Sequence, residues 1–293
     1  MINMRYFIVS LAAVFLALGI GIFIGFTVDG QEIFLNQQET LIDEMEYKFG
    51  EIRTENEELQ ENLNLKNQEI KNYEDFTNII FPTLANSKLQ NLNLAIIETN
   101  DDYIYNEIPS TIEKAGGKVS LTLYIKKEFL LENSEKFNKV YNYFAKEKGE
   151  TVEKDNFLAF LSEKVSEAIL EQDTQTLEFL KKQDIIELKG EYTNNIDCFI
   201  IAGGSASKEG LGMVKKVDIP LIDKIKQYNI SVIGVEQSNV KYSYMEQYKK
   251  QKISTIDNID TLIGQYSLIE VIQGNDGNYG IKSSANLLVP QPQ

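Results

Sequence analysis

The hydrophobic pattern of the chain begins with one uninterrupted apolar run, residues 6–26, which contains no charged side chain. A run of this length matches the roughly 20 residues that cross a bilayer as a helix. Arg5 precedes the run, whereas Asp29 and Glu32 follow it. Because Lys and Arg favour the cytoplasmic side, we predict a single-pass anchor with a cytoplasmic N-terminus (1–5) and the bulk of the chain outside the cytoplasm.

A cleaved signal peptide is the alternative interpretation of this run. A signal peptide has an apolar core of roughly 7–15 residues followed by a small-x-small cleavage site. The run here is longer and no such site follows Gly25, so the pattern favours an anchor. The anchor also carries small residues four apart, which fall on one helix face and let two backbones approach closely. These residues are Ala13, Ala17, Gly21 and Gly25.

A heptad repeat follows the anchor over residues 31–75. Its apolar residues recur every 3.5 positions, as in the seam of a coiled coil. The a positions are Leu35, Ile42, Phe49, Asn56, Leu63 and Ile70, and the d positions are Gln38, Met45, Ile52, Leu59, Lys66 and Tyr73. Nine of these twelve are apolar or aromatic, which predicts a self-associating coiled coil. Chains that share one anchor polarity pair in parallel, so we predict a homodimer through coil and anchor.

Asn56 is the informative exception in this seam. A single buried Asn at an a position fixes the register and favours a defined oligomer, at some cost in stability. The alternative is one long amphipathic helix folded back on a globular domain. Such a helix normally shows a wider apolar stripe than this narrow seam.

The remaining chain alternates short apolar runs with helical patterns. It follows residues 76–91, which contain Phe81-Pro82 and a polar stretch ending in Asn91 and which we interpret as a linker. The predicted strands are 92–98, 119–125, 199–202, 231–235 and 253–256. The predicted helices are one capped by Asp101 or Asp102 and ending at Gly116-Gly117, then 152–182, 219–228, 242–250 and 261–272. This alternation predicts an α/β domain over 92–290, Rossmann-like or flavodoxin-like, with three layers and a mainly parallel sheet.

Acidic and small residues fall at the predicted carboxyl ends of these strands, the edge where open parallel sheets bind ligands. They are Glu98, Gly203, Gly204, Ser205, Glu236 and Asp257. The loop 203–212 could cradle an anion with its backbone amides. It lacks the phosphate-loop pattern, however, and a structural turn is the favoured interpretation. The carboxylates could hold a hard cation such as calcium, although a solvated acidic rim is favoured.

Composition removes several classes of function. The chain has 293 residues and a formal net charge of −15, which argues against binding nucleic acid. It has no histidine, so the usual general base and the commonest metal ligand are both missing. Its single cysteine, Cys198, lies in an apolar stretch, which predicts a small core residue. We find no nucleophile–base arrangement and no paired carboxylates, and we predict a protein that is not an enzyme, without cofactor.

Three segments resemble the bacterial copper transport outer membrane protein family, typified by mycobacterial copper transport protein B. The most specific is residues 4–22, MRYFIVSLAAVFLALGIGI, with its arginine, serine and late glycines. The others are Ile256–Gly264 and Asn278–Gly280, and the acidic coil after the anchor is also similar to that of the family. In layout, the resemblance spans the whole chain.

The resemblance implies an envelope protein that serves copper efflux or homeostasis. Some relatives look like partners of the cell-separation machinery, coupled to peptidoglycan hydrolases. Copper prefers sulfur from Cys and Met and imidazole nitrogen. This chain offers no imidazole, one thiol and five scattered methionines, so we predict no tight metal site.

Two functions therefore stand side by side. The first is a dimeric, non-enzymatic component of copper homeostasis in the envelope. The second is a coiled-coil scaffold that binds protein partners in cell separation, or in the control of peptidoglycan hydrolases, without binding metal. The metal sensitivity of a deletion strain, compared with its cell-separation defects, would distinguish them.

Overall fold

A computed structural model describes residues 4–149, 153–190 and 195–291 of the chain, without the side chains of 28–36 and 147. The chain forms two compact units, Met1–Glu74 and Asp75–Gln293. The first consists of most of helix α1 (Met4–Ala85). The portion Met4–Thr27 is long and apolar enough to cross a membrane, and it is the one such helix in the part of the chain described.

Helix α1 continues without a break through the predicted coiled coil. Good helix formers such as Glu, Leu, Lys and Gln dominate this part of the chain. Ion pairs one turn apart support it, for example Lys48 with Glu51 at 2.6 Å and Arg53 with Glu57 at 3.1 Å. These pairs are exposed and stabilise the helix only modestly.

The second unit alternates helices and strands. In chain order its strands are β1 (Asn93–Glu98), β2 (Lys118–Ile125), β3 (Ile186–Gly190), β4 (Cys198–Ala202), β5 (Ser231–Val235), β6 (Ser254–Ile256) and β7 (Asn278–Tyr279). Its α-helices are α2 (Glu107–Lys114), α3 (Ser134–Asn142), α4 (Phe157–Leu170), α5 (Thr174–Lys182), α6 (Gly210–Lys216), α7 (Asp218–Gln227), α8 (Met245–Lys250) and α9 (Leu262–Ile272). Short helices of other kinds are η1 (Lys127–Leu130), η2 (Tyr143–Glu147) and η3 (Lys154–Asn156).

The seven strands form one sheet in the order β3-β2-β1-β4-β5-β6-β7. All neighbours pair in parallel except β2 and β3, which are antiparallel. The chain winds outward from β1 to β2, then returns to place β4 on the other side of β1. With β3 included, this order matches the Rossmann fold; without that antiparallel edge strand, the parallel strands follow the flavodoxin order. In both descriptions, the β1–β4 boundary is the topological switch point.

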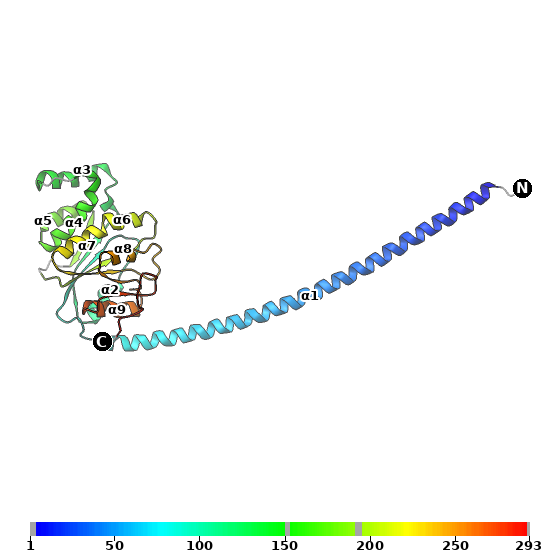
Figure 1. The fold of residues 1–293 in the computed structure, drawn as a ribbon, viewed down its shortest axis with the longest axis horizontal. Helices are drawn as coiled ribbons and strands as arrows, with labels where there is room; N and C mark the ends of the chain where they lie inside the picture. Colours follow the sequence, from blue (N-terminus) through cyan, green and yellow to red (C-terminus); the bar gives the residue numbers. More distant parts are fainter. Residues whose placement is uncertain (1–3, 150–152, 191–194, 292–293) are drawn as a thin grey trace. The chain divides into compact units, whose positions relative to one another are not determined.

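Helices cover both faces of the sheet and give the predicted three layers. Figure 1 shows α2 and α9 on one side of the strands and α4, α5 and α7 on the other. Alternate residues of β1 serve the two faces: Ile96 belongs to the core under α2 and α9, whereas Ile97 belongs to the core under α4 and α7. Strand β4 is buried along its whole length, as expected for a central parallel strand.

The stretch 76–91, predicted as a linker, differs from that expectation. It is helical up to Ala85 and belongs to the compact unit that begins at Asp75. The side chains of Phe81, Ala85 and Leu89 are buried against the sheet face that carries α2 and α9. Leu89 N–H also donates to the carbonyl of Ala115, at 2.9 Å. Apolar side chains spaced four apart thus make this segment part of the core.

Two other helix predictions need correction. The stretch 152–182 is not one helix, because the backbone turns left-handed at Gln172 (φ 58°) and Asp173 then caps α5; residue 152 itself lies outside the described residues. Helix α2 begins at Glu107 after Asn106, so neither Asp101 nor Asp102 caps it. The predicted strands and the helix that ends at 272 are confirmed, with Thr261 as the cap of α9.

Candidate functional site

A hollow at the carboxyl edge of the sheet lies at the switch point between β1 and β4. It has a volume of about 500 Å³. The loops after β1, β2 and β4 and the helices α6 and α7 surround it. Its lining includes Thr99, Asn100, Asp101, Asp102, Ile125, Lys126, Lys127, Phe129, Leu130, Glu132, Ser205, Ser207, Glu209, Gly210, Met213, Val217, Asp218 and Tyr244. This is the position at which open α/β sheets bind ligands.

Asp218 is the most unusual side chain of this hollow. It begins α7 and is buried, with 1% of its surface exposed. Its Oδ2 accepts hydrogen bonds from Thr99 Oγ1 at 2.9 Å and from the Tyr248 hydroxyl. Burial raises the pKa of the Asp218 carboxyl to about 7, and the two hydroxyl donors only partly oppose this effect. Asp218 can therefore hold a proton near neutral pH.

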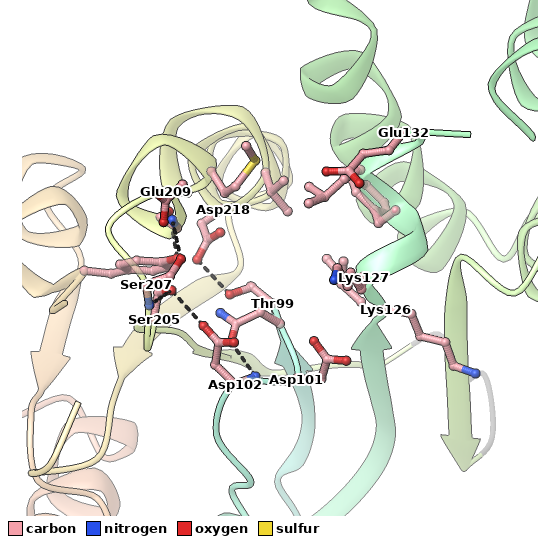
Figure 2. A pocket seen from close by; sticks show the side chains of 18 residues that line it. Thr99, Asp101, Asp102, Lys126, Lys127, Glu132, Ser205, Ser207, Glu209 and Asp218 are labelled. Carbon is pink, nitrogen blue, oxygen red and sulfur yellow. Dashed lines mark hydrogen bonds between the residues drawn. The ribbon is translucent and has the colours of Figure 1, made fainter. Parts of the chain in front are cut away.

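A second carboxylate joins the loops that follow β1 and β4. Asp102 Oδ2 accepts from Ser205 Oγ at 2.7 Å and from the backbone N–H of Ala206 at 2.9 Å (Figure 2). Asn100 strengthens the same junction, since its Nδ2 donates to the carbonyl of Gly204 at 2.9 Å. Ser207 N–H in turn donates to Ser205 Oγ at 3.1 Å. A network of hydrogen bonds thus joins the loops after β1 and β4 at the hollow.

The charges around the hollow are mainly negative. Asp101, Asp102, Glu132 and Glu209 are exposed at its rim, where the one exposed lysine of the lining is Lys127. Lys126 points away from these carboxylates in Figure 2 and pairs with Asp184 at 2.6 Å. That partnership raises the pKa of Lys126. Chemically, such a rim favours cationic or hydroxyl-bearing small molecules over anions.

Of the six cleft candidates predicted at strand ends, only Ser205 lines this hollow. Glu98 is buried, and burial raises the pKa of its carboxyl to about 7. It lies on the face of β1 that carries Leu94 and Ile96, away from the hollow. Gly203 and Gly204 do not line the hollow. The lack of a side chain at Gly203 makes room for Tyr248, because a Cβ added there would lie 2.1 Å from the Tyr248 hydroxyl oxygen.

Glu236 and Asp257 bind other parts of the domain instead of lining the hollow. Glu236 is fully buried, and its Oε1 accepts from Lys282 Nζ at 2.7 Å. Burial raises the pKa of Glu236, whereas Lys282 opposes the rise. Asp257 accepts from the backbone N–H groups of Ile281 and Lys282, at 2.7 and 2.9 Å. Both carboxylates therefore anchor the C-terminal segment.

Sequence reasoning missed the groups that actually build the hollow, Thr99, Asp102 and Asp218 above all. Asp218 had one available signal: an acidic residue followed by Pro220 marks the first turn of a helix. Helix α6 begins within the loop 203–212, at Gly210. The position of α6 and α7 beside the hollow depends on the order of the strands in the sheet, which no local sequence pattern reveals.

Sulfur and other metal ligands are dispersed in the part of the chain that the structure describes. No group of three or more Cys, Asp or Glu side chains there has the arrangement to hold a metal ion. Met213 lines the hollow, whereas Met245 is buried in the core and Met45 is exposed on α1. Cys198 is buried, which raises the pKa of its thiol to about 12 and keeps it protonated.

The residues predicted to pair two copies all lie on the continuous helix α1. In a single chain, eight apolar seam side chains are more than half exposed: Ile42, Met45, Phe49, Ile52, Leu59, Leu63, Ile70 and Tyr73. Asn56 Nδ2 donates to the carbonyl of Ile52 at 2.9 Å. Leu35 belongs to the helix, but its side chain lies outside the described part. The small residues of the predicted anchor, Ala13, Ala17, Gly21 and Gly25, are exposed as well.

Comparison with known families identifies this arrangement. Residues 1–290 match the family described as copper transport outer membrane protein, MctB. The chain belongs to this family. The match covers α1 and the α/β domain together, so it confirms the resemblance seen along the whole chain. Membership implies a role in copper transport or homeostasis at the cell envelope. None of the curated proteins searched matches the chain.

Proposed function

We propose that this protein is a membrane-anchored, dimeric, non-enzymatic component of copper transport or homeostasis in the cell envelope. The family match over residues 1–290 carries the proposal. It favours the copper role over a scaffold that acts only in cell separation. The anchor, the coil and the α/β domain each then have a distinct part in that role.

The anchor holds the α/β domain at a membrane. Met4–Thr27 has the length and composition of a spanning helix. Arg5 on the N-terminal side and the acidic residues that follow give the charge asymmetry of a helix with its N-terminus in the cytoplasm. The α/β domain would then lie outside the cytoplasm, where it can meet other envelope proteins as partners.

The coil supports a parallel dimer. Eight seam side chains that are more than half exposed in one copy would be buried by a second helix. Isolated helices gain little stability from propensity alone and depend on packing of an apolar face. A second helix packed against the seam would provide that packing, and Asn56 at an a position favours two helices in register.

Copper handling by this chain does not rest on a tight site of the usual kind. The methionines described are spread over α1, α6 and α8, and the Cys198 thiol is protonated and buried. Soft ligands gathered at one point are what Cu(I) requires. The protein would therefore act through its partners or through the hollow at the switch point. Cys198 is equally unsuited to be a nucleophile, and Ser205 is bound within a loop network, which supports a non-enzymatic role.

The test is a deletion strain followed for two phenotypes. Growth on a copper gradient and cell-associated copper are measured together with the proportion of unseparated cells. We expect lower copper tolerance that the intact gene restores. Normal copper tolerance combined with chains of unseparated cells would contradict the proposal and support the scaffold function.

A further inference from the structure

The end of α1 carries an apolar face that its own domain leaves open. Residues 76–86 contain no charged side chain, although the chain as a whole has a net charge of −15. One side of this segment, with Phe81 and Ala85, is buried in the domain. The neighbouring side is exposed: 61% of Phe76 and 45% of Leu84 remain accessible.

This exposed side forms one wall of a groove of about 200 Å³ whose other wall is α9. The groove is lined by Phe76, Thr77, Ile80, Phe81, Leu84, Leu262, Ile263, Tyr266 and Val289. None of these side chains is charged. Tyr266 is held in place by Lys88, whose Nζ lies 5.3 Å from the centre of the ring. The groove is therefore an apolar surface with a fixed wall on the α9 side.

The heptad register of the coil continues into this groove. Counting on from Ile70 and Tyr73, the next a positions are Thr77 and Leu84, and the next d position is Ile80. All three line the groove. The helix is continuous to Ala85, so the register is not interrupted by a linker. The seam thus has two more turns than the coiled coil predicted from the sequence, and these turns lie inside the α/β domain.

We propose that the groove is occupied by residues 76–84 of a second copy of this chain. The proposal rests on the parallel dimer of the proposed function and extends it into the domain. A two-fold axis along the coil places the same residues of both copies opposite each other, as an isologous interface requires. Each helix end would then contact its counterpart and also the α9 of the other copy, through Ile263.

Charge supports a second copy over an unrelated partner. Two copies that each carry −15 repel one another wherever acidic faces meet. The uncharged segment 76–86 is the part of α1 beyond the coil where this repulsion is absent. Like the seam before it, the segment offers apolar side chains at a and d positions, here Leu84 and Ile80, and therefore suits its own copy best.

The test is cysteine cross-linking of the full-length protein in isolated membranes, in a Cys198→Ser background. Ile80→Cys places a thiol at the proposed d position, and Asn78→Cys places one on the exposed face of the same helix turn. Ile52→Cys reports on the coil itself. After oxidation with diamide, we expect Ile80→Cys and Ile52→Cys to give several-fold more covalent dimer than Asn78→Cys, because thiols bridge only at short Cα separations.

A second variant tests the α9 wall. Ile263 is 39% exposed, so Ile263→Asp should leave the domain folded. We expect it to reduce the Ile80→Cys cross-link several-fold and to leave the Ile52→Cys cross-link unchanged. Cross-linking at Ile52 but not at Ile80 would overturn the extension while the coil dimer stands. Cross-linking at neither position would overturn both proposals, and equal yields at Ile80 and Asn78 would overturn the groove interface.

Discussion

At the scale of single residues, the buried carboxyl of Asp218 makes the stability of the fold depend on pH. Its pKa rises from an ordinary 3.8 to about 7, a difference that corresponds to roughly 4 kcal/mol. The folded state disfavours the charged form, so this group contributes most stability below pH 4. That contribution is lost as the pH rises towards 7 and the buried carboxyl ionises.

We therefore expect Asp218→Asn to stabilise the protein most at pH 8 and to change little near pH 3. The amide keeps an acceptor for Thr99 and Tyr248 but carries no charge. The gain should reach a few kcal/mol in the free energy of unfolding at pH 8, measured by thermal unfolding of the full chain in detergent. Asp223→Asn, an exposed change on the same helix, is the control. A variant less stable than wild type at pH 8 would contradict a raised pKa.

The roles of some single residues could not be predicted from the sequence. Glu236 and Asp257 do follow β5 and β6, as predicted from the pattern. Their use as internal partners of Lys282 and of the backbone at 281–282 depends on where the C-terminal segment folds. A carboxylate at a strand end looks the same in sequence whether it faces a ligand or a returning chain segment.

At the scale of elements, the end of α1 decides where the domain begins. Phe81 is 5% exposed and packs with the core under α2 and α9, whereas Ile79 is 75% exposed two residues earlier. We expect Phe81→Ala to lower the free energy of unfolding by about 3–5 kcal/mol, the range for large core truncations.

Ile79→Ala is the matched control for this change and should alter stability by less than about 0.5 kcal/mol. Urea unfolding of both full-length variants measures the difference. If residues 76–91 were a linker, neither substitution would matter, so equal unfolding midpoints would refute the assignment of this segment to the core.

Strong local patterns predicted most elements, and weak ones were missed. The central strands β1, β4 and β5 consist largely of apolar residues, and their buried positions follow from that composition. Strand β3 was not predicted, because Ile186–Gly190 is an edge strand with exposed Lys189 and Gly190. Helix α3 was missed for a similar reason: among its nine residues only Val140 is fully buried. Elements of this kind form through neighbours that are distant in sequence.

At the scale of the whole molecule, the anchor predicts the topology of the chain. Ser283 is exposed near the C-terminal end of the α/β domain. With Cys198→Ala, a Ser283→Cys thiol should react with an impermeant maleimide in intact cells, because the domain is expected outside the cytoplasm. Asn3→Cys, which leaves Arg5 in place, provides the control for the cytoplasmic side. Labelling of Ser283→Cys only after lysis would reverse the proposed orientation.

The whole-molecule account combines the anchor, the dimeric coil and a role in copper tolerance. Leu59→Asp with Leu63→Asp places two charges per chain in the seam, where an unpaired buried charge costs several kcal/mol. Asn64→Asp with Gln68→Asp adds the same charge at positions outside the seam. Neither pair touches the α/β domain, which has its own core.

The most direct test is the copper tolerance of a deletion strain that carries each of these variants at wild-type levels. The account predicts that the seam variant is as copper-sensitive as the deletion, whereas the control variant restores tolerance fully. Full restoration by the seam variant would contradict the claim that this protein serves copper homeostasis as a coiled-coil dimer.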